Sequence, residues 1–136
     1  MKALSQAIFT KTTGSALSTA LGGRIYKGRA PDGTAYPYAV YLLVSDVPDP
    51  TFTETLENVL IQWSLFSSAS SSGEIEDLFA NLKTLFDDCS LTITGETLLW
   101  FQRANATLMI EDHTTPDGTV DVWHYAVDYD IKIQVP

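Results

Sequence analysis

The sequence predicts an α+β fold in which a mostly antiparallel β-sheet is covered on one face by an amphipathic helix and an N-terminal helix. Three observations lead to this fold class. One central stretch repeats apolar residues at helical spacing, several long stretches alternate apolar and polar residues, and Pro-Asp-Gly turns separate β-like runs. With 136 residues, of which 45% are apolar and 18% charged, we expect residues 1–136 to form a single globular domain.

The N-terminal segment is expected to be helical over residues 3–21, with a break in the threonine- and glycine-rich run at 10–14. Gly22 and Gly23 then end the helix, because glycine readily adopts the left-handed conformation that follows a last helical turn. Residues 24–26 are expected to form a short strand ahead of a turn-rich segment.

Two strands are expected next, at residues 38–45 and 58–67. The segment between them, 45–57, is rich in Pro, Thr and Asp, and we expect a long loop there because proline cannot donate a strand hydrogen bond. The second strand alternates so that one face is apolar. That face carries Val59, Ile61, Trp63 and Leu65.

The clearest helix covers about residues 72–88. Ser71 and Glu74 stand in the S-x-x-E relation of a capping box, which predicts a helix start. The apolar residues that follow recur at positions i, i+3, i+4, i+7, i+10 and i+11, which places them on one helical face. They are Ile75, Leu78, Phe79, Leu82, Leu85 and Phe86.

Three β segments are expected in the remaining chain, at 91–93, 97–111 and 120–135. The last keeps a period of two over an unusual length, which predicts one face on the core and one toward water or a partner. A Pro-Asp-Gly-Thr tetrapeptide at 116–119 lies between the last two segments and repeats the one at 31–34. Because proline and glycine suit successive turn positions, we interpret both copies as turns rather than as duplicated binding loops.

No motif for catalysis or cofactor binding is evident. The serines form no G-x-S-x-G motif, and the glycines match no phosphate-binding loop. Cys89 follows two aspartates at a predicted helix end, where negative charge raises a thiol's pKa and so disfavours a nucleophile. The stretch Glu111-Asp112-His113 can approach His124 across the hairpin around Gly118, and two histidines with a carboxylate suit zinc, but no ligand-spacing motif is present. We therefore expect no catalytic residue, no metal and no cofactor.

The net charge of −9 disfavours binding that depends on contact with nucleic-acid phosphates or with anionic membrane surfaces. No apolar run approaches the roughly 20 residues that span a bilayer. The densest basic patch consists of Arg24, Lys27 and Arg29. With Tyr36, these residues are candidates for a contact with an acidic neighbouring subunit, and the plain alternative is that they keep a loop soluble.

Four short stretches, in this order of elements, resemble a known family. They are Gly23-Arg24-Ile25-Tyr26, Ala30-Pro31, Pro37-Tyr38 and Ile61-Gln62-Trp63-Ser64. Together with the helix, the small "LTITGE" hairpin and the long terminal strand, they are similar to the tail-completion, or tail-terminator, family of long-tailed bacteriophages. The similarity covers nearly the whole chain.

The resemblance implies a structural virion protein without active-site residues. Its copies would form a ring, typically a hexamer, at the head-proximal end of the finished tail tube, where the ring stops tube growth and joins the tail to the head connector. The implied partners are other copies of the chain, the tail tube protein and the connector or neck protein. Assembly would take place in the host cytoplasm without a membrane, and DNA would pass through the lumen without specific binding.

Several acidic residues are candidates for the lumen or for loops that reach a neighbour, because like charges would keep DNA from adhering. They are Asp46, Asp49, Glu54 and Glu57, with Asp128 and Asp130 as further lumen candidates. Two other readings stay open. In the first, the chain would be another neck or tail-tube component. In the second, it would be a small-molecule-binding domain or enzyme with a pocket between helix and sheet.

Overall fold

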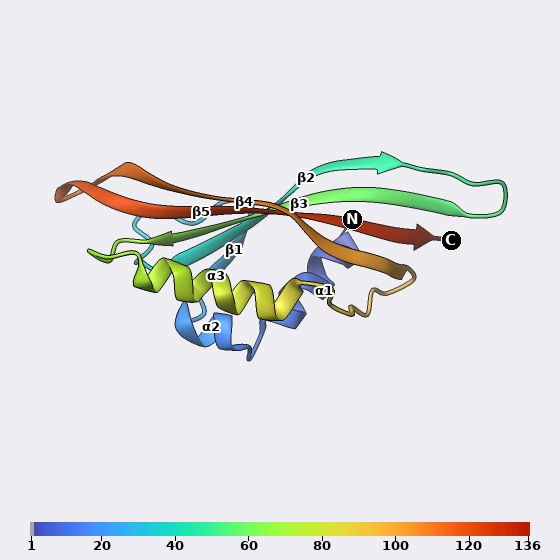
Figure 1. Ribbon diagram of the computed structural model, residues 1–136, viewed down its shortest axis with the longest axis horizontal. Helices are drawn as coiled ribbons and strands as arrows, with labels where there is room; N and C mark the ends of the chain where they lie inside the picture. The colour runs from blue at the N-terminus through green and yellow to red at the C-terminus, as the bar shows by residue number, and fades with distance from the viewer. Residues whose placement is uncertain (1) are drawn as a thin grey trace.

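The structure, a computed structural model, describes residues 2–136. Five strands form one mixed sheet in the order β1-β2-β3-β5-β4, and three helices lie together on one face of it (Figure 1). The α+β class is therefore confirmed. No helix within residues 2–136 is both long and apolar enough to cross a membrane. The elements are α1 (Lys2–Thr12), α2 (Ala16–Ala20), β1 (Ile25–Lys27), β2 (Tyr38–Pro48), β3 (Thr55–Ser67), α3 (Gly73–Phe86), β4 (Thr97–Thr115) and β5 (Gly118–Val135).

The N-terminal helix is broken where the sequence predicts a break. α1 ends at Thr12, and α2 starts again after Ser15, whose hydroxyl accepts a hydrogen bond from the Ser18 backbone N–H at 3.2 Å. This is an N-cap that restarts the helix in a new direction. Gly22 and Gly23 follow with φ angles of 60° and 76°, which confirms them as the helix terminator.

The β2–β3 hairpin is longer than predicted. β2 continues to Pro48 and β3 begins at Thr55, so the long loop expected at 45–57 is wrong and the turn covers only 49–54. β1 pairs with β2 only as far as Tyr41. Beyond that point the outer edge of β2 is open, and Pro48 can sit there without breaking a ladder hydrogen bond.

The β4–β5 hairpin closes through a two-residue turn. Pairing runs from Thr97 opposite Gln134 to Thr115 opposite Gly118, which confirms the second Pro-Asp-Gly as a hairpin turn. The strand expected at 91–93 is wrong, because the segment forms only an isolated bridge between Ile93 and Glu96.

The core lies between α3 and the sheet. All the predicted apolar positions of α3 pack there, with Phe86 stacked on Phe101 at a ring-centroid distance of 5.3 Å and 5.4 Å from Trp63. The predicted capping box is wrong. Ser71 makes no cap, and Glu74 instead accepts a hydrogen bond from the Ser67 hydroxyl at 2.6 Å, which ties the first turn of α3 to the end of β3.

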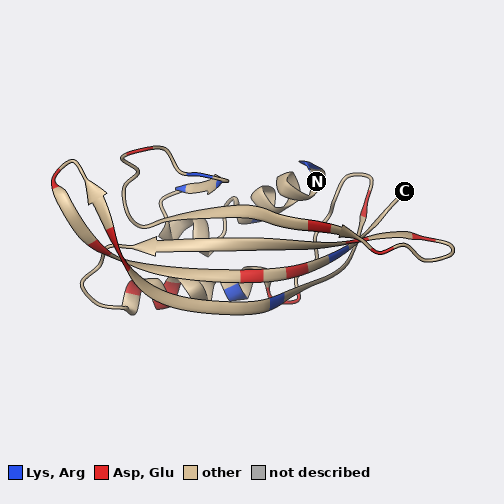
Figure 2. Ribbon diagram, turned by 90° about the horizontal axis from the view of Figure 1, so that it is seen from above, with Lys and Arg blue, Asp and Glu red and all other residues tan. Residues whose placement is uncertain are grey.

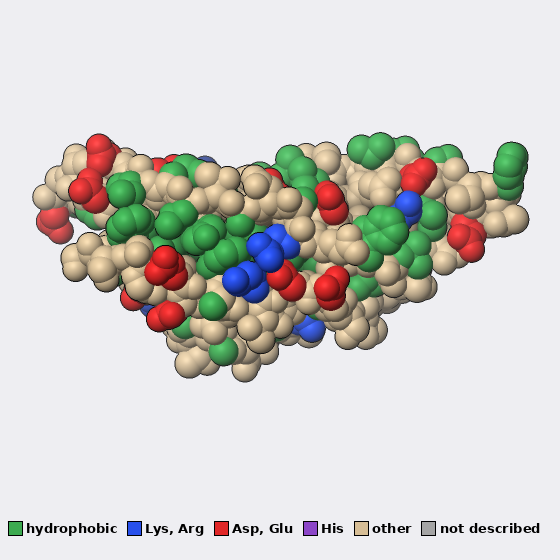
Figure 3. All heavy atoms as spheres, viewed as in Figure 1, with side chains coloured by type: hydrophobic (Ala, Val, Ile, Leu, Met, Phe, Trp, Pro, Cys, Tyr) green, Lys and Arg blue, Asp and Glu red, His purple; other side chains and the backbone are tan. Residues whose placement is uncertain are grey.

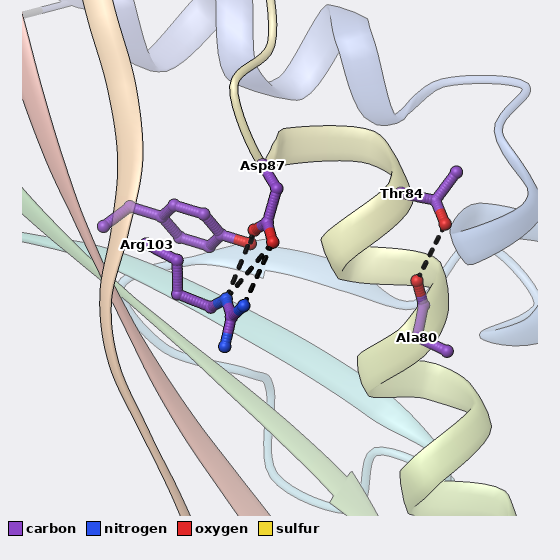
Figure 4. A network of polar contacts seen from close by, with 5 residues as sticks. Ala80, Thr84, Asp87 and Arg103 are labelled. Atoms are coloured by element: carbon purple, nitrogen blue, oxygen red, sulfur yellow. Dashed lines mark hydrogen bonds and ion pairs between the residues drawn. The ribbon is translucent and has the colours of Figure 1, made fainter.

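A polar network fixes the other end of α3 (Figure 4). Asp87 accepts a hydrogen bond from the buried Tyr129 hydroxyl at 2.8 Å and pairs with the Arg103 guanidinium at 3.2 Å. Burial and the neighbouring Asp87 carboxylate raise the pKa of Tyr129, so its hydroxyl remains a donor. The helix is thereby tied to β4 and β5 together.

The two hairpins project from opposite ends of the body (Figure 1). The β2–β3 turn extends beyond the helices on one side, and the β4–β5 turn extends beyond them on the other. The face of the sheet turned away from the helices, which we call the outer face, carries no helix. The two projecting hairpins and the outer face are therefore the parts of the molecule that are open to contact with other chains.

Candidate assembly surfaces

Two histidines meet one carboxylate on the outer face. The Glu111 carboxylate lies 3.2 Å from His113 Nε2 and 3.1 Å from His124 Nδ1. The Tyr36 hydroxyl lies 2.7 Å from His113 Nδ1. A neutral His113 that donates a hydrogen bond from Nε2 to Glu111 can accept a hydrogen bond at Nδ1 from the Tyr36 hydroxyl. Both ring nitrogens then have a hydrogen-bond partner. Within residues 2–136, no three His, Cys, Asp or Glu side chains are arranged to hold a metal ion.

This cluster fastens the turn-rich segment ahead of β2 to the β4–β5 hairpin. Phe66 stacks on His124 at 4.4 Å, and Tyr38 stacks on Phe66 at 4.8 Å, so aromatic rings surround the polar contact. Tyr36, predicted as an interface residue, is thus half-buried and engaged within its own chain. Its link to His113 spans 77 residues, a separation that no local sequence pattern reveals.

Glu111 makes folding sensitive to acid. Partial burial alone would raise its pKa, but His124 and His113 outweigh that effect and hold the pKa of Glu111 below its ordinary value. A lowered pKa in the folded state stabilises the fold above the ordinary value of 4.5, and this contribution is lost as the pH falls through the folded-state pKa. We expect Glu111→Gln to be less stable than wild type at pH 6 and to converge with it as the pH falls through the folded-state pKa of Glu111, as measured by urea unfolding at a series of decreasing pH values. A constant gap between the two proteins across this range would contradict the assignment.

The first Pro-Asp-Gly-Thr copy and the end of β4 that leads to the second copy line one hollow. Its volume is about 530 Å³, and its lining includes residues 30–34 and 112–116. In the first copy the Thr34 backbone N–H donates to the Pro31 carbonyl at 3.2 Å, so this tetrapeptide is also a turn. The hollow is acidic at its rim, where Asp112 lies opposite Asp121 and raises the pKa of Asp121.

Charge is strongly segregated along the chain. Residues 1–31 contain five Lys or Arg and no acidic residue, whereas residues 32–136 contain three Lys or Arg and all seventeen acidic residues. The basic segment forms α1, α2 and β1, so the positive charge gathers along the β1 side of the sheet (Figure 2). The acidic residues are spread over the other elements, so a contact between the basic side of one chain and acidic side chains of another chain would be attractive.

The predicted basic patch divides in the structure. Arg24 donates from Nε to the Pro37 carbonyl at 2.9 Å, so it serves its own chain by holding β1 to the start of β2. Lys27 and Arg29 are exposed, and neither forms an ion pair with any residue in the described range 2–136. These two side chains are therefore free to meet a partner.

A large groove lies beside this basic side. Its volume is about 1060 Å³, and it lies between α1, β1 and residues 90–94. We call it the lysine-rimmed groove, because Lys2, Lys11 and Lys27 line it together with apolar side chains. The apolar lining includes Ala3, Ala7, Phe9, Ile25 and Leu91.

Cys89 is half-buried at the end of α3. Burial is the main cause that raises its pKa, the carboxylates of Asp87 and Asp88 add to the rise, and Lys11 opposes it. The predicted direction is confirmed, although burial rather than the carboxylates is the leading cause. A thiol with a raised pKa is a poor nucleophile at neutral pH.

The six acidic lumen candidates fall in three places. Asp46 and Glu57 lie on β2 and β3 on the helix side, where burial, Asp46 and Glu96 raise the pKa of Glu57. Asp49 and Glu54 lie in the β2–β3 turn, and Asp49 pairs with Lys132 at 2.8 Å. The remaining two, Asp128 and Asp130, lie on the outer face of β5. One channel surface therefore cannot hold all six.

Large apolar side chains are exposed on both hairpins. Phe52 at the β2–β3 turn is fully exposed, and hydrophobic atoms stand clear of the body at that tip (Figure 3). Leu42, Val44 and Val47 are exposed on the open stretch of β2, and Trp100, Leu108 and Ile110 on β4, which is an edge strand along its whole length. Exposed apolar residues on open sheet edges mark surfaces that another chain covers.

One family model matches nearly the whole chain. The family model described as "Tail completion protein gp17" matches residues 6–134. One chain of a solved structure, described as the virion of a native gene transfer agent (GTA) particle, matches with a TM-score of 0.72 at 12% identity, covering 96% of this chain and 94% of that one. A second solved chain matches with a TM-score of 0.55 at 14% identity and the same coverage. A search of curated proteins finds no relative.

The two solved chains show a shared fold, since their identities are low. The family assignment has a separate basis, because the family model spans nearly the whole sequence. The surfaces described above fit a protein that works by contact, with a basic side, an acidic remainder and exposed apolar edges. This chain belongs to the tail completion protein gp17 family and is a structural protein of a virion tail.

Proposed function

We propose that this protein forms a ring of identical subunits, typically a hexamer, at the head-proximal end of the tail tube. The ring ends tube growth and offers a surface to the head connector. The observation that carries the proposal is the family match over residues 6–134. The sheet also has two different edges, β1–β2 and β4, and this difference supports a ring built from head-to-tail contacts.

Strand directions suit a head-to-tail arrangement. β2, β3, β5 and β4 are successively antiparallel, so β4 runs opposite to β2. The sheet therefore ends in two different edges, β1–β2 on one side and β4 on the other. Contacts between two different surfaces close into a ring when the rotation permits it.

Charge segregation favours the same arrangement. The exposed Lys27 and Arg29 on the basic side would meet acidic side chains of the next copy. Tyr36 contributes indirectly, because its bond to His113 holds the adjoining turn in place. These contacts would steer copies into register more than they would add affinity.

The outer face fits the wall of a DNA channel. Asp128 and Asp130 lie on it beside neutral polar neighbours such as Gln62 and Gln102, and Gln62 donates to Asp128 at 3.0 Å. A negatively charged wall lets DNA pass without adhering, because like charges repel at short range. We accordingly propose the lumen role for these two residues, and of the other four candidates we propose Glu54 for a contact between chains.

Deleting the gene during phage assembly tests the proposal. We expect tails of uncontrolled length that cannot join heads, and purified protein added back should cap isolated tubes. Light scattering on the purified protein and on its mixture with tubes should show a ring rather than a small species. Absence of tubes after the deletion would point to a tube subunit instead, and a permanently monomeric protein that never caps tubes would contradict the proposal.

A further inference from the structure

We propose that the tip of the β2–β3 hairpin of one copy docks into the lysine-rimmed groove of the neighbouring copy, with Phe52 as the apolar anchor. This inference rests on the proposed function in one respect, that copies of the chain assemble. It goes further by naming the two surfaces that meet.

The tip is a preformed projection. The Asp49 backbone N–H donates to the Leu56 carbonyl at 2.8 Å, and that of Thr51 donates to the Glu54 carbonyl at 2.9 Å. The Thr51 hydroxyl also accepts from the Glu54 N–H at 3.0 Å. Within this fixed turn the exposure of Phe52 reaches 110% of the reference value. An aromatic ring held fully in water on an ordered turn loses little entropy on binding and has much apolar area to bury.

The groove has the complementary chemistry. Its volume of about 1060 Å³ is ample for an aromatic ring and part of the turn, and its lining is apolar beneath the lysines. Phe9 is 49% exposed there. None of Lys2, Lys11 and Lys27 forms an ion pair within the described part of the chain. The groove therefore offers apolar contact and unpaired positive charge together.

The charges beside Phe52 match that rim. Glu54 is exposed two residues away and forms no ion pair within residues 2–136. Asp49, at the other end of the turn, is already paired with Lys132, which lowers the pKa of Asp49 and keeps it charged. Docking would place the Phe52 ring among apolar groups and Glu54 beside a lysine, the pattern of an anchor with a polar rim.

A second copy is the occupant that the geometry favours. The hairpin runs away from the body (Figure 1), whereas the groove is lined by α1, β1 and residues 90–94. The tip cannot reach its own groove without breaking the β2–β3 pairing, which extends to Pro48 opposite Glu57. Each copy carries one tip and one groove, so tip-to-groove contacts run head to tail and can close into a ring.

Phe52→Ala tests the anchor. We expect the variant to fold as wild type by circular dichroism and to need at least about 30-fold higher concentration for half-assembly, as for truncation of an anchor residue. Thr53→Ala is the matched control, since Thr53 is exposed in the same turn beside Phe52 but has no ring to bury. We expect the control to assemble as wild type. A Phe52→Ala protein that assembles normally overturns the inference.

Charge exchange identifies the partner surface. Glu54→Lys alone should weaken assembly, and combining it with Lys11→Glu or Lys27→Glu should restore it in at least one pair, because the exchanged charges again attract. Restoration in neither pair would overturn the assignment of the groove.

A cross-link tests the contact directly. In a Cys89→Ser background, Phe52→Cys in one preparation and Phe9→Cys in another are mixed and oxidised with copper–phenanthroline. We expect a disulfide-linked dimer on non-reducing gels from the mixture only. If rings form without this cross-link, the inference is overturned and the proposed function still stands. The same conclusion holds if Phe52→Ala forms normal rings that fail to cap tubes. Wild type that neither assembles nor caps tubes would overturn the proposed function.

Discussion

Phe86→Ala is expected to lower the free energy of unfolding by about 3–5 kcal/mol, the range found for removing a buried aromatic ring. Phe86 is 0% exposed in the last turn of α3 and packs against Phe101, Trp63 and Tyr129. Its removal leaves a cavity between the helix and strands β3, β4 and β5. Because the strands are held by ladder hydrogen bonds and α3 is fixed by Asp87, the site cannot collapse to fill that cavity.

Urea unfolding at neutral pH measures the loss. A small domain is stable by about 5–15 kcal/mol in total, so this single change removes a large share of its stability. Phe52→Ala is the matched control, because it deletes the same ring from a fully exposed position and should change stability by less than about 0.5 kcal/mol. Equal unfolding midpoints for Phe86→Ala and wild type would show that Phe86 is not a packing centre.

The contrast between these two phenylalanines shows what the sequence can predict. Phe86 belongs to a helical repeat of apolar residues, and that periodicity places it on the core without any knowledge of topology. β5 is equally clear, because its alternation runs nearly the whole length of the strand. Phe52 stands in a Pro- and Thr-rich stretch without periodicity, so its exposure on an ordered turn follows only from the three-dimensional arrangement.

The missed elements depend on neighbours distant in the chain. Two prolines suggest that β2 stops before residue 46, yet the strand continues to Pro48 because nothing pairs with its outer edge there. The Ser71–Glu74 pair fits a capping box, yet Glu74 bonds Ser67 at the end of β3. Local sequence rules identify groups that need a hydrogen-bond partner or a neighbouring strand. The tertiary structure determines which group or strand becomes that partner.

The assembly surfaces were partly predictable. The sequence shows Lys27 and Arg29 as a basic patch, and the lack of any acid before Asp32 is a stronger signal of the same kind that a count along the chain reveals. The lysine-rimmed groove is different, since Lys2, Lys11 and Lys27 come together only through the packing of α1 beside β1. Likewise, strand alternation alone does not say that Asp128 faces away from the helices and Glu57 toward them.

In the proposed ring, Asp128→Lys together with Asp130→Lys is expected to create DNA binding that the wild-type protein lacks. The pair changes the charge of the outer face of β5 by four units in each subunit, and a ring repeats this change around its channel. Contacts between lysines and phosphates release counterions, so the affinity for a short duplex should fall by about 10³-fold between 50 and 200 mM salt if six phosphates are contacted. Wild-type rings should show no measurable binding under either condition.

The matched control separates the position of the charge from its amount. Glu76 and Asp77 are exposed on the first turns of α3, on the helix side of the sheet, and changing both to lysine alters the net charge equally. We expect this control to bind DNA far more weakly, because its lysines lie outside a channel whose walls would bring many of them around one duplex. Fluorescence anisotropy with labelled duplex, after light scattering has shown intact rings, measures both variants. Equal binding by the two would mean that Asp128 and Asp130 do not line the channel. Stronger binding by the α3 variant would place the helix side, and not the outer face of the sheet, toward the DNA.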